Sequence, residues 1–285
     1  MSAPEVPRPA ARSRVTGSVD RRGVVPVSPR TAAALVLASA AGLVMLGWPL
    51  IVDVDPGSRM DPPFLFLLLM PAVLVVVLVE MTEGGMDSRV LALLGVLAAL
   101  DAVMRLLSAG TAGVELVFFL LILAGRVFGP GFGFVLGVLA LFASALLTAG
   151  VGPWLPFQMI CAAWVGMGAG LLPRRVRGRA EVAMLMAYGV VAAYAYGLLT
   201  NLSGWPFLFG IGVPGASGDI QYVPGDPTLE NLRRFVAYTL ITSTTSWDTG
   251  RAITTAVAIA VLGPAVLVTL RRAARRAVVT GTTAQ

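Results

Sequence analysis

The chain has 285 residues, of which 57% are hydrophobic and 13% are charged, and its mean hydropathy is +0.84. Soluble domains carry roughly 25% charged residues, so this composition excludes an ordinary water-soluble globule and predicts a membrane protein. The basic residues, all of them arginines, outnumber the acids 21 to 15 and give a formal net charge of +6. Such a balance is typical of nucleic-acid binding, of contact with anionic lipid or of topology signals, and the positions of the arginines decide among these.

Residue types that the chain lacks exclude several function classes. There is no histidine, and the single cysteine, Cys161, lies inside an apolar run. An intrachain disulfide, a histidine-ligated metal and a histidine general base are therefore excluded. Without lysine the chain has no GxxxxGK[ST] loop for ATP, so energy-driven work needs an outside source. We expect no metal and no cofactor.

Long apolar stretches predict an all-α, polytopic transmembrane helical bundle. A spanning helix needs about 20 apolar residues. Subdividing the stretches at their glycine- and proline-rich breaks gives eight predicted spans, at residues 32–52, 62–80, 89–107, 112–127, 130–149, 154–172, 182–200 and 250–270. The transmembrane domain then covers 32–272, between a disordered, Arg- and Pro-rich tail at 1–31 and a short tail at 273–285.

The arginines test this count, because short cytoplasmic loops concentrate basic residues. They gather before the first span, after the sixth and after the eighth, at Arg8, Arg12, Arg14, Arg21, Arg22 and Arg30, at Arg174, Arg175, Arg177 and Arg179, and at Arg271, Arg272, Arg275 and Arg276. Even numbers of spans separate the three groups, so all fall on one side. The pattern indicates topology rather than nucleic-acid binding, and predicts a plasma-membrane protein with both termini in the cytoplasm.

Two predicted outer segments carry aromatic residues. The segment 201–248 is rich in glycine, proline and aromatic residues, and its part 233–247 predicts a short helix dipping into the outer half of the membrane. The second segment, 150–163, joins spans five and six. The aromatic rings suit ligand stacking and equally suit anchoring at the lipid interface, and the sequence leaves both interpretations open.

These two segments predict the mouth of a small-molecule site, mostly apolar with few polar groups. Aromatic rings would pack on the ligand, while an amide and hydroxyls would form hydrogen bonds with it. The residues expected there are Trp154, Phe157, Gln158, Trp205, Tyr222, Tyr238, Thr242 and Trp247. For Gln158 the alternative is a hydrogen bond to a neighbouring helix.

Two charged residues fall inside the third predicted span. Asp101 and Arg105 are four residues apart, so they share one helix face and are expected to pair. An isolated charge at mid-membrane costs about 3 kcal/mol, which favours mutual neutralisation as their role. The alternative is that the pair positions a polar ligand or a neighbouring helix.

Small residues recur every four positions on three predicted spans, a spacing that lets helices approach closely. The three stripes are Ala34, Ala38 and Gly42, then Gly129, Gly133 and Gly137, then Ala162, Gly166 and Gly170. Most of these residues are expected to pack inside the bundle. The first stripe lies on a terminal span, which is often peripheral, so it is the predicted docking face for another membrane subunit.

Three of these features resemble the substrate-binding membrane subunits of energy-coupling factor (ECF) vitamin transporters of the actinobacterial type. The Ala34-xxx-Ala38 pattern is similar to the alanine motif by which such subunits dock on a coupling subunit. Residues 124–173 resemble the family's Gly-Pro-xx-Gly turn, followed by a Pro-Phe start and a small-residue helix. Residues 245–276 resemble the last helix of actinobacterial members, with Asp248 and Arg251 near its outer start.

The resemblance implies a substrate-capture subunit that is not an enzyme. A transmembrane coupling subunit and two ABC ATPases would supply the energy, and the ligand would be a water-soluble vitamin or related micronutrient. Cobalamin or another corrinoid is the lead, because a large aromatic outer segment suits a large ligand. The family usually has a six-helix core, and the eight spans predicted here depart from that pattern.

Two other classes compete with this interpretation. A polytopic membrane enzyme acting on lipid needs ionisable groups clustered at one depth, and the acids Asp101, Glu115 and Asp248 are scattered along the sequence. A secondary transporter typically shows duplicated halves with interrupted helices, and we detect no such repeat. Uptake that needs no ATPase would favour the secondary transporter.

Overall fold

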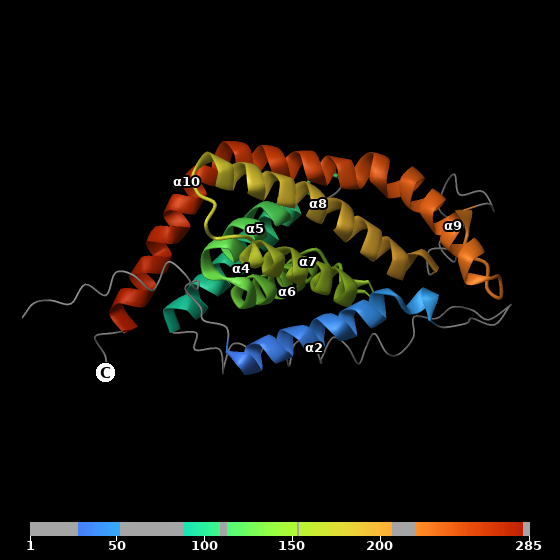
Figure 1. The fold of residues 1–285 in the computed structure, drawn as a ribbon, viewed down its shortest axis with the longest axis horizontal. Helices are drawn as coiled ribbons and strands as arrows, with labels where there is room; N and C mark the ends of the chain where they lie inside the picture. Colours follow the sequence, from blue (N-terminus) through green and yellow to red (C-terminus); the bar gives the residue numbers. More distant parts are fainter. Residues whose placement is uncertain (1–27, 52–87, 109–112, 153, 207–219, 282–285) are drawn as a thin grey trace, which may run out of the picture.

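A computed structural model describes residues 28–51, 88–108, 113–152, 154–206 and 220–281, and within these ranges every regular element is helical. The elements are α2 (Pro29–Leu46), the short 3-10 helix η1 (Trp48–Leu50), α4 (Ser88–Ser108), α5 (Val117–Phe128), α6 (Pro130–Leu147), α7 (Leu155–Leu171), α8 (Arg179–Gly204), α9 (Thr228–Thr239), the π-helix η4 (Leu240–Asp248) and α10 (Thr249–Gly281). Figure 1 shows α4 to α7 in the centre, with α8 and α10 along one side and α2 along the opposite side.

The predicted all-α membrane bundle is confirmed. A helix occupies each predicted segment except 62–80, which lies outside the described residues, as does the predicted tail up to residue 27. Four helices among the described residues are long and apolar enough to cross a membrane: Pro29–Leu46, Pro130–Leu147, Arg179–Gly204 and the continuous helix Thr228–Arg276. Val117–Phe128 and Leu155–Leu171 are apolar but shorter.

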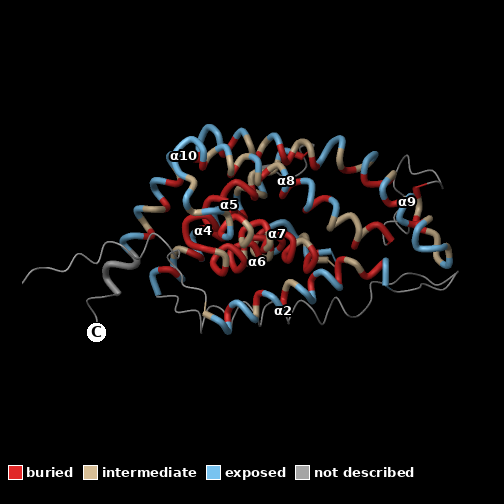
Figure 2. Tube along the Cα trace, viewed as in Figure 1, coloured by how far each residue is buried: buried red, intermediate tan, exposed pale blue. Residues whose placement is uncertain are grey.

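Helix α5 is the centre of the bundle. All 12 of its residues are buried, and it packs against α6, α7, α8 and α10. At about 1.5 Å per residue it is about 18 Å long, which is shorter than the hydrocarbon core of a bilayer. Figure 2 shows that buried residues concentrate in these central helices, whereas the outer helices alternate buried and exposed residues. The outer helices therefore shield α5 from the surroundings.

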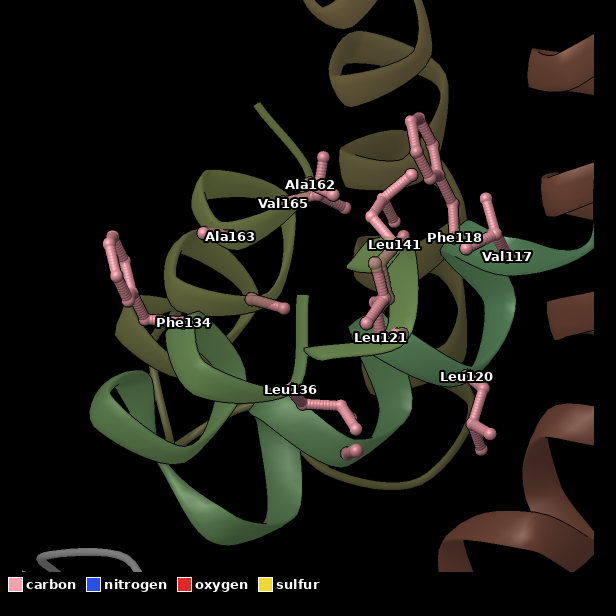
Figure 3. Packing of buried hydrophobic residues seen from close by; sticks show 14 of the residues in the cluster. Val117, Phe118, Leu120, Leu121, Phe134, Leu136, Leu141, Ala162, Ala163 and Val165 are labelled. Atoms are coloured by element: carbon pink, nitrogen blue, oxygen red, sulfur yellow. The ribbon is translucent and has the colours of Figure 1, made fainter. Parts of the chain in front are cut away.

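Glycines set the spacing of the central helices. An added Cβ on Gly133 or Gly166 would overlap the other glycine's backbone, and one on Gly137 would overlap the backbone at Ala162. The second and third predicted stripes therefore pack on each other inside the bundle, as expected. Figure 3 shows buried hydrophobic side chains that α5, α6 and α7 contribute to the core, among them Phe118, Leu136 and Val165. Gly129 forms the tight turn between α5 and α6. Its φ of 114° is a backbone conformation that residues with a Cβ rarely adopt.

Helix α2 packs on α7 through part of the first stripe. Ala38 and Gly42 are buried and Ala34 is partly buried, and a Cβ on Gly42 would meet the Ile160 side chain at 2.7 Å. The Trp164 indole of α7 also donates a hydrogen bond of 3.0 Å to Ser39 Oγ. The predicted docking face is thus turned largely into the bundle, because its small residues accommodate bulky side chains of α7.

The last helix is longer than the sequence interpretation suggested. The segment 233–247, expected as a separate short helix, is continuous with α10, and helix Thr228–Arg276 has 49 residues. No glycine or proline occurs between 228 and 249, so nothing in that segment separates it from α10, although Pro264 lies inside α10 itself. α10 also extends to Gly281, into the predicted C-terminal tail. At about 1.5 Å per residue the continuous helix measures about 74 Å, more than twice a bilayer core.

A small aromatic cluster covers the end of the bundle where α8 ends and α9 begins. Trp205, Tyr222, Phe235 and Tyr238 pack there with Ile220. The Trp205 indole donates to the Ile220 carbonyl at 3.0 Å, and its ring lies 5.3 Å from that of Tyr222. These contacts hold residues 220–223 against α9. Residues 207–219, which belong to the predicted outer segment, lie outside the described residues.

Candidate ligand-binding site

A cavity of about 260 Å³ lies between α8 and η4, near the same end of the bundle as the aromatic cluster. Its lining comes from α4, α7, α8, α9, η4, α10 and the segment before α5. The lining residues are Arg105, Glu115, Gln158, Tyr196, Gly197, Thr200, Asn201, Tyr238, Thr242, Ser243, Trp247, Asp248 and Arg251. Charged, hydroxyl and amide groups dominate this set, so the site is polar rather than mostly apolar as predicted.

One wall of the cavity is a connected network of charged groups. The Arg251 guanidinium forms an ion pair with Glu115 and donates a second hydrogen bond, of 3.0 Å, to Asp248 Oδ1. Ser243 Oγ donates to the other Asp248 oxygen at 2.8 Å. Asp248 and Arg251 are 1% and 7% exposed, so these two members of the network are almost fully removed from solvent. A buried charge needs partners of this kind.

Two aromatic rings lie beside the Arg251 guanidinium. Its central carbon lies 4.8 Å from the ring centroid of Tyr196 and 5.5 Å from that of Phe118. Both distances are within the range of cation–π attraction. The two ring centroids lie 5.0 Å from each other, so the rings form one aromatic surface beside Arg251, while its N–H groups are held by two carboxylates. Its position fixes the two acids in the cavity wall.

Glycine allows the network to approach α8. Gly197 of α8 lies directly against the Asp248 carboxylate, and an added Cβ there would overlap the carboxylate atoms. Gly113, with φ of 82°, packs in the same way on the Trp247 backbone. Any larger residue at these two positions would push η4 away from the rest of the bundle. Of the two glycines, Gly197 also lines the cavity.

The π-helical turn η4 brings its polar side chains to the cavity. Hydrogen bonds in a π-helix join residues five apart, so such residues lie one above the other. Ser243 and Asp248 have this spacing and are hydrogen bonded through their side chains. Thr249 Oγ1 likewise donates to the carbonyl of Thr244, five residues earlier, at 2.6 Å. Short π-helical segments occur frequently at functional sites.

Arg105 forms a second charged feature of the cavity. Its guanidinium donates to Ser144 Oγ at 3.0 Å and to Gln158 Oε1 at 3.3 Å. The Asp101 carboxylate, although fully buried, has no hydrogen-bond partner within the described part of the chain. The predicted direct pair between Asp101 and Arg105 is therefore not formed. The reason is that Arg105 reaches across to α6 and α7 instead of along its own helix.

Asn201 presents an unused donor at the cavity. Asn201 lines it, and among the described residues its buried amide nitrogen Nδ2 has no hydrogen-bond acceptor. Buried polar groups are nearly always hydrogen bonded, so an unpaired donor in a cavity wall indicates a place for a ligand. Thr200 lies beside it, and its hydroxyl donates to the Tyr196 carbonyl at 2.7 Å.

Half of the predicted ligand-binding residues line this cavity: Gln158, Tyr238, Thr242 and Trp247. The other half do not. Trp154 is 52% exposed, Phe157 is buried in the main core, and Trp205 and Tyr222 pack in the aromatic cluster. These positions depend on which way each side chain points at the end of its helix, and the sequence contains no direct signal for that.

The sequence interpretation missed most of the charged wall. Glu115, Asp248 and Arg251 were noted but not assigned to the site, and Arg105 was assigned to a structural pair. Tyr196, Thr200, Asn201 and Ser243 were not considered. A usable signal existed, because ionisable residues within apolar membrane segments commonly mark functional sites. Within the described residues no group of three or more His, Cys, Asp or Glu side chains is arranged to hold a metal ion.

Fold and site together define a polytopic helical membrane protein with a polar cavity near one end of its bundle. A family model described as "ECF transporter, substrate-specific component" matches residues 89–280, more than half of the chain. The chain therefore belongs to the family of ECF transporter substrate-specific components, as its motifs indicated. A search of curated proteins and a search of solved structures return no match.

Membership states the general role of the chain. A substrate-specific component is an integral membrane protein that binds the substrate of an ECF transporter and works with the membrane and ATPase subunits of an ECF module. The matched region contains α4 to α10, which supply all the residues that line the cavity. The actinobacterial subtype stays a prediction.

Proposed function

We propose that this chain captures a water-soluble vitamin or related micronutrient in the cavity between α8 and η4. A coupling subunit driven by two ABC ATPases then moves that ligand into the cytoplasm. The observation that carries the proposal is the unpaired Asn201 donor in a polar cavity of a substrate-specific component. Such a cavity is costly to form in a membrane protein unless a ligand uses its polar groups.

The orientation of the bundle supports capture from outside. Glu181 joins Arg126 and Arg271 at the end of α5 and α10 that lies away from the cavity, and Arg126 also donates to the carbonyl of Val176. The arginine groups near residues 174–179 and 271–276 therefore share that end. Because cytoplasmic ends of spans concentrate arginine, the cavity faces outward in our proposal.

The cavity volume favours a small ligand. At about 260 Å³ it is below the roughly 300–1,000 Å³ of sites for drug-sized molecules. A corrin ring with its side chains is much larger than this volume. We therefore place the predicted cobalamin below the smaller water-soluble vitamins as a candidate substrate.

Helix α2 is the proposed contact with the coupling subunit, through a different face from the predicted one. Ala38 and Gly42 are covered by α7. The exposed face of α2 combines small residues, Ala33 and Ala40, with Leu37 and Val44, which are 69% and 62% exposed. Small residues of this kind permit close approach of a partner helix.

Thermal unfolding of the purified chain in lipid nanodiscs tests the capture proposal. The chain would be heated with each of a panel of water-soluble vitamins that includes cobalamin. A ligand at about a thousand times its Kd adds about 4 kcal/mol to the folded state, which raises the unfolding temperature clearly. We expect one small vitamin to do this. No shift with any vitamin from a well-folded sample would contradict the proposal, and a shift with cobalamin alone would contradict the size argument.

Two variants and an uptake assay complete the test. Asn201→Ala is expected to reduce the shift, whereas Arg234→Gln, which changes an ion pair with Asp226 outside the cavity, should leave it unchanged. Uptake of the identified vitamin should require the ATPase subunits. Uptake by cells that carry this chain without them would instead support a secondary transporter.

A further inference from the structure

Two polar groups of the cavity lie one helical turn apart on the same face of α8. Gly197 and Asn201 are four residues apart, and both line the cavity. Side chains at this spacing begin about 5–6 Å from each other. Gly197 has no side chain, and the Asp248 carboxylate fills its place, because a Cβ added there would overlap the carboxylate atoms. The Asp248 carboxylate and the Asn201 amide are therefore neighbours in the cavity wall.

The Asn201 amide supplies a donor to this pair. Its nitrogen Nδ2 is buried, and within the described residues it has no hydrogen-bond acceptor, the neighbouring carboxylate included. An amide nitrogen carries two N–H donors and accepts nothing, and leaving it unpaired in a buried place is costly. A ligand atom that faces Asn201 Nδ2 must therefore be an acceptor, such as a carbonyl oxygen or a ring nitrogen.

The Asp248 carboxylate supplies an acceptor. Its two oxygens accept hydrogen bonds from Arg251 Nη1 at 3.0 Å and from Ser243 Oγ at 2.8 Å. These two bonds leave acceptor capacity, because an ionised carboxylate offers about four lone-pair sites and donates nothing. A ligand atom that faces Asp248 must therefore carry a hydrogen, as an N–H group does.

Neighbouring contacts hold both groups in position. Asp248 is held by Arg251, whose guanidinium also pairs with Glu115. The end of α8 that carries Asn201 is held by the Trp48 indole, which donates to the Ser203 carbonyl at 3.1 Å. A site whose groups are already fixed loses less conformational freedom when it binds a ligand. The donor and the acceptor are therefore presented to the cavity in a defined order along α8.

This order sets the polarity that a bound compound needs. An edge with an acceptor toward Asn201 and an N–H group toward Asp248 satisfies both side chains at once. The reversed edge would place lone pairs against the carboxylate and N–H against N–H, and such juxtaposition works against binding. A carboxylate of the ligand would likewise offer only acceptors to Asp248.

We propose that Asn201 and Asp248 together recognise an amide-type edge, in which an acceptor and an N–H group are neighbours. The acceptor of the edge accepts from Asn201 Nδ2, and its N–H donates to the Asp248 carboxylate. The proposal rests on the capture function and names the substrate class: amides, lactams, cyclic ureas and aminopyrimidines. Trp247, which also lines the cavity, provides an aromatic residue beside a planar compound that carries such an edge.

Retention from a divided panel of water-soluble vitamins tests this selection. Nicotinamide, biotin, thiamine and riboflavin carry an amide-type edge, whereas nicotinate, lipoate and ascorbate have no N–H group at neutral pH. The purified chain in nanodiscs would be incubated with all of them, and bound compounds would be eluted and identified by mass spectrometry. We expect every retained compound to carry the edge. Preferential retention of nicotinate, lipoate or ascorbate would overturn the proposal.

Methylation of the edge nitrogen tests the bond to Asp248 without altering the protein. The N-methylated form of the retained vitamin, for example N,N-dimethylnicotinamide in place of nicotinamide, keeps the acceptor and lacks the N–H. Its affinity, measured by isothermal titration, should be about ten- to a hundredfold lower, as expected for one lost hydrogen bond to a charged group. Equal affinity of the two forms would contradict the proposed edge.

A substitution at Asn201 tests the other bond. Asn201→Leu removes the donor and keeps a side chain of similar size, and it should weaken binding of the retained vitamin by about two- to tenfold, as for one hydrogen bond between neutral groups. If this variant fails to fold, Asn201→Ala replaces it. Arg234→Gln changes an ion pair with Asp226 outside the cavity and is the control, which should bind as the unaltered chain does.

The outcomes separate this proposal from the capture function. If the unaltered chain retains no vitamin, capture itself fails, and the selection fails with it. If it retains a vitamin whose binding neither methylation nor the Asn201 variant weakens, capture stands and the amide-type edge is wrong. If both changes weaken binding while Arg234→Gln does not, the recognition of the edge by Asn201 and Asp248 is supported.

Discussion

The bundle contains two three-membered clusters of charge, one at each end, with opposite composition. The cavity cluster has two acids around one arginine, and the cluster at the far end has two arginines around one acid. Their members are Glu115, Asp248 and Arg251 in the first, and Arg126, Glu181 and Arg271 in the second. Both connect α10 to the segment around α5, so they hold the same helices at opposite ends.

The far cluster is closed. Arg126 Nε donates to Glu181 at 2.7 Å, and its two Nη atoms donate to the carbonyls of Leu172, Pro173 and Val176. Four of its five N–H donors are thus used within the chain. Glu181 is 2% exposed and also accepts from Arg271. This cluster fixes the loop after α7 against α5, α8 and α10.

The cavity cluster is open on one side. Its acids line a space, and no hydrogen bond to a loop carbonyl is described for Arg251. Similar ion pairs therefore have different roles, depending on which groups use their remaining hydrogen-bonding capacity. Backbone carbonyls complete the far cluster and make it a structural joint. The cavity cluster leaves acceptor capacity toward the cavity, where a ligand can complete it.

The largest expected effect is the loss of stability when the closed cluster is broken. Glu181→Gln removes the acid from between Arg126 and Arg271, and breaking a buried ion pair costs about 3–5 kcal/mol. We expect a loss of this size in the free energy of unfolding, measured by denaturant titration in detergent. The matched control is Glu230→Gln, whose ion pair with Arg233 spans 3.6 Å at the surface and should contribute at most about 1 kcal/mol. Equal losses in both variants would contradict the structural role.

The next expected effect is on the close contact between α6 and α7. Gly166→Ala places a Cβ against the Gly133 backbone and should force α6 and α7 apart, with a loss of about 1–3 kcal/mol. Gly95→Ala is the control, because nothing lies within 4 Å of an added Cβ there and alanine favours a helix. Thermal unfolding should show a lower midpoint for the first variant and an unchanged or higher one for the second.

A third prediction concerns Gly197, the glycine that lies against the open cluster. Gly197→Ala would displace the Asp248 carboxylate, since the added Cβ overlaps it. We expect ligand affinity to fall at least about tenfold, equivalent to about 1.4 kcal/mol. Binding of the vitamin identified by the thermal panel, measured by isothermal titration, checks this. Gly204→Ala, in the same helix with open space around it, should bind normally. An unchanged affinity in Gly197→Ala would show that Asp248 does not contribute to ligand binding.

The smallest effect is expected at Trp154. This side chain was predicted to bind ligand, but it is 52% exposed and lies outside the lining of the cavity. Trp154→Ala should therefore change affinity by less than about twofold and stability by about 0.5 kcal/mol or less, as for other surface substitutions. The same titration applies. A large loss of affinity would show that the ligand extends beyond the cavity toward this residue.

The small-residue stripes show which helix contacts the sequence predicts and which it does not. The stripes at Gly133 and Gly166 were expected to pack inside the bundle, because close helix contacts need small residues, and they do so. The stripe at Ala38 and Gly42 has the same spacing, yet its orientation was not predictable. A helix exposed to lipid and a helix packed on a neighbour both accept apolar side chains on every face, so hydrophobicity does not distinguish the two.

The sequence by itself determined that the chain is an all-α membrane protein, where most of its described helices lie, and that the arginines near 174–179 and 271–276 share one end. These properties depend on apolar length and on local charge, which are readable one segment at a time. The tertiary structure alone decided that Arg105 turns from Asp101 to Gln158, and that Glu115 meets Arg251. Such contacts join residues far apart in the chain, and they follow from helix packing and from the π-helical turn, which no local pattern specifies.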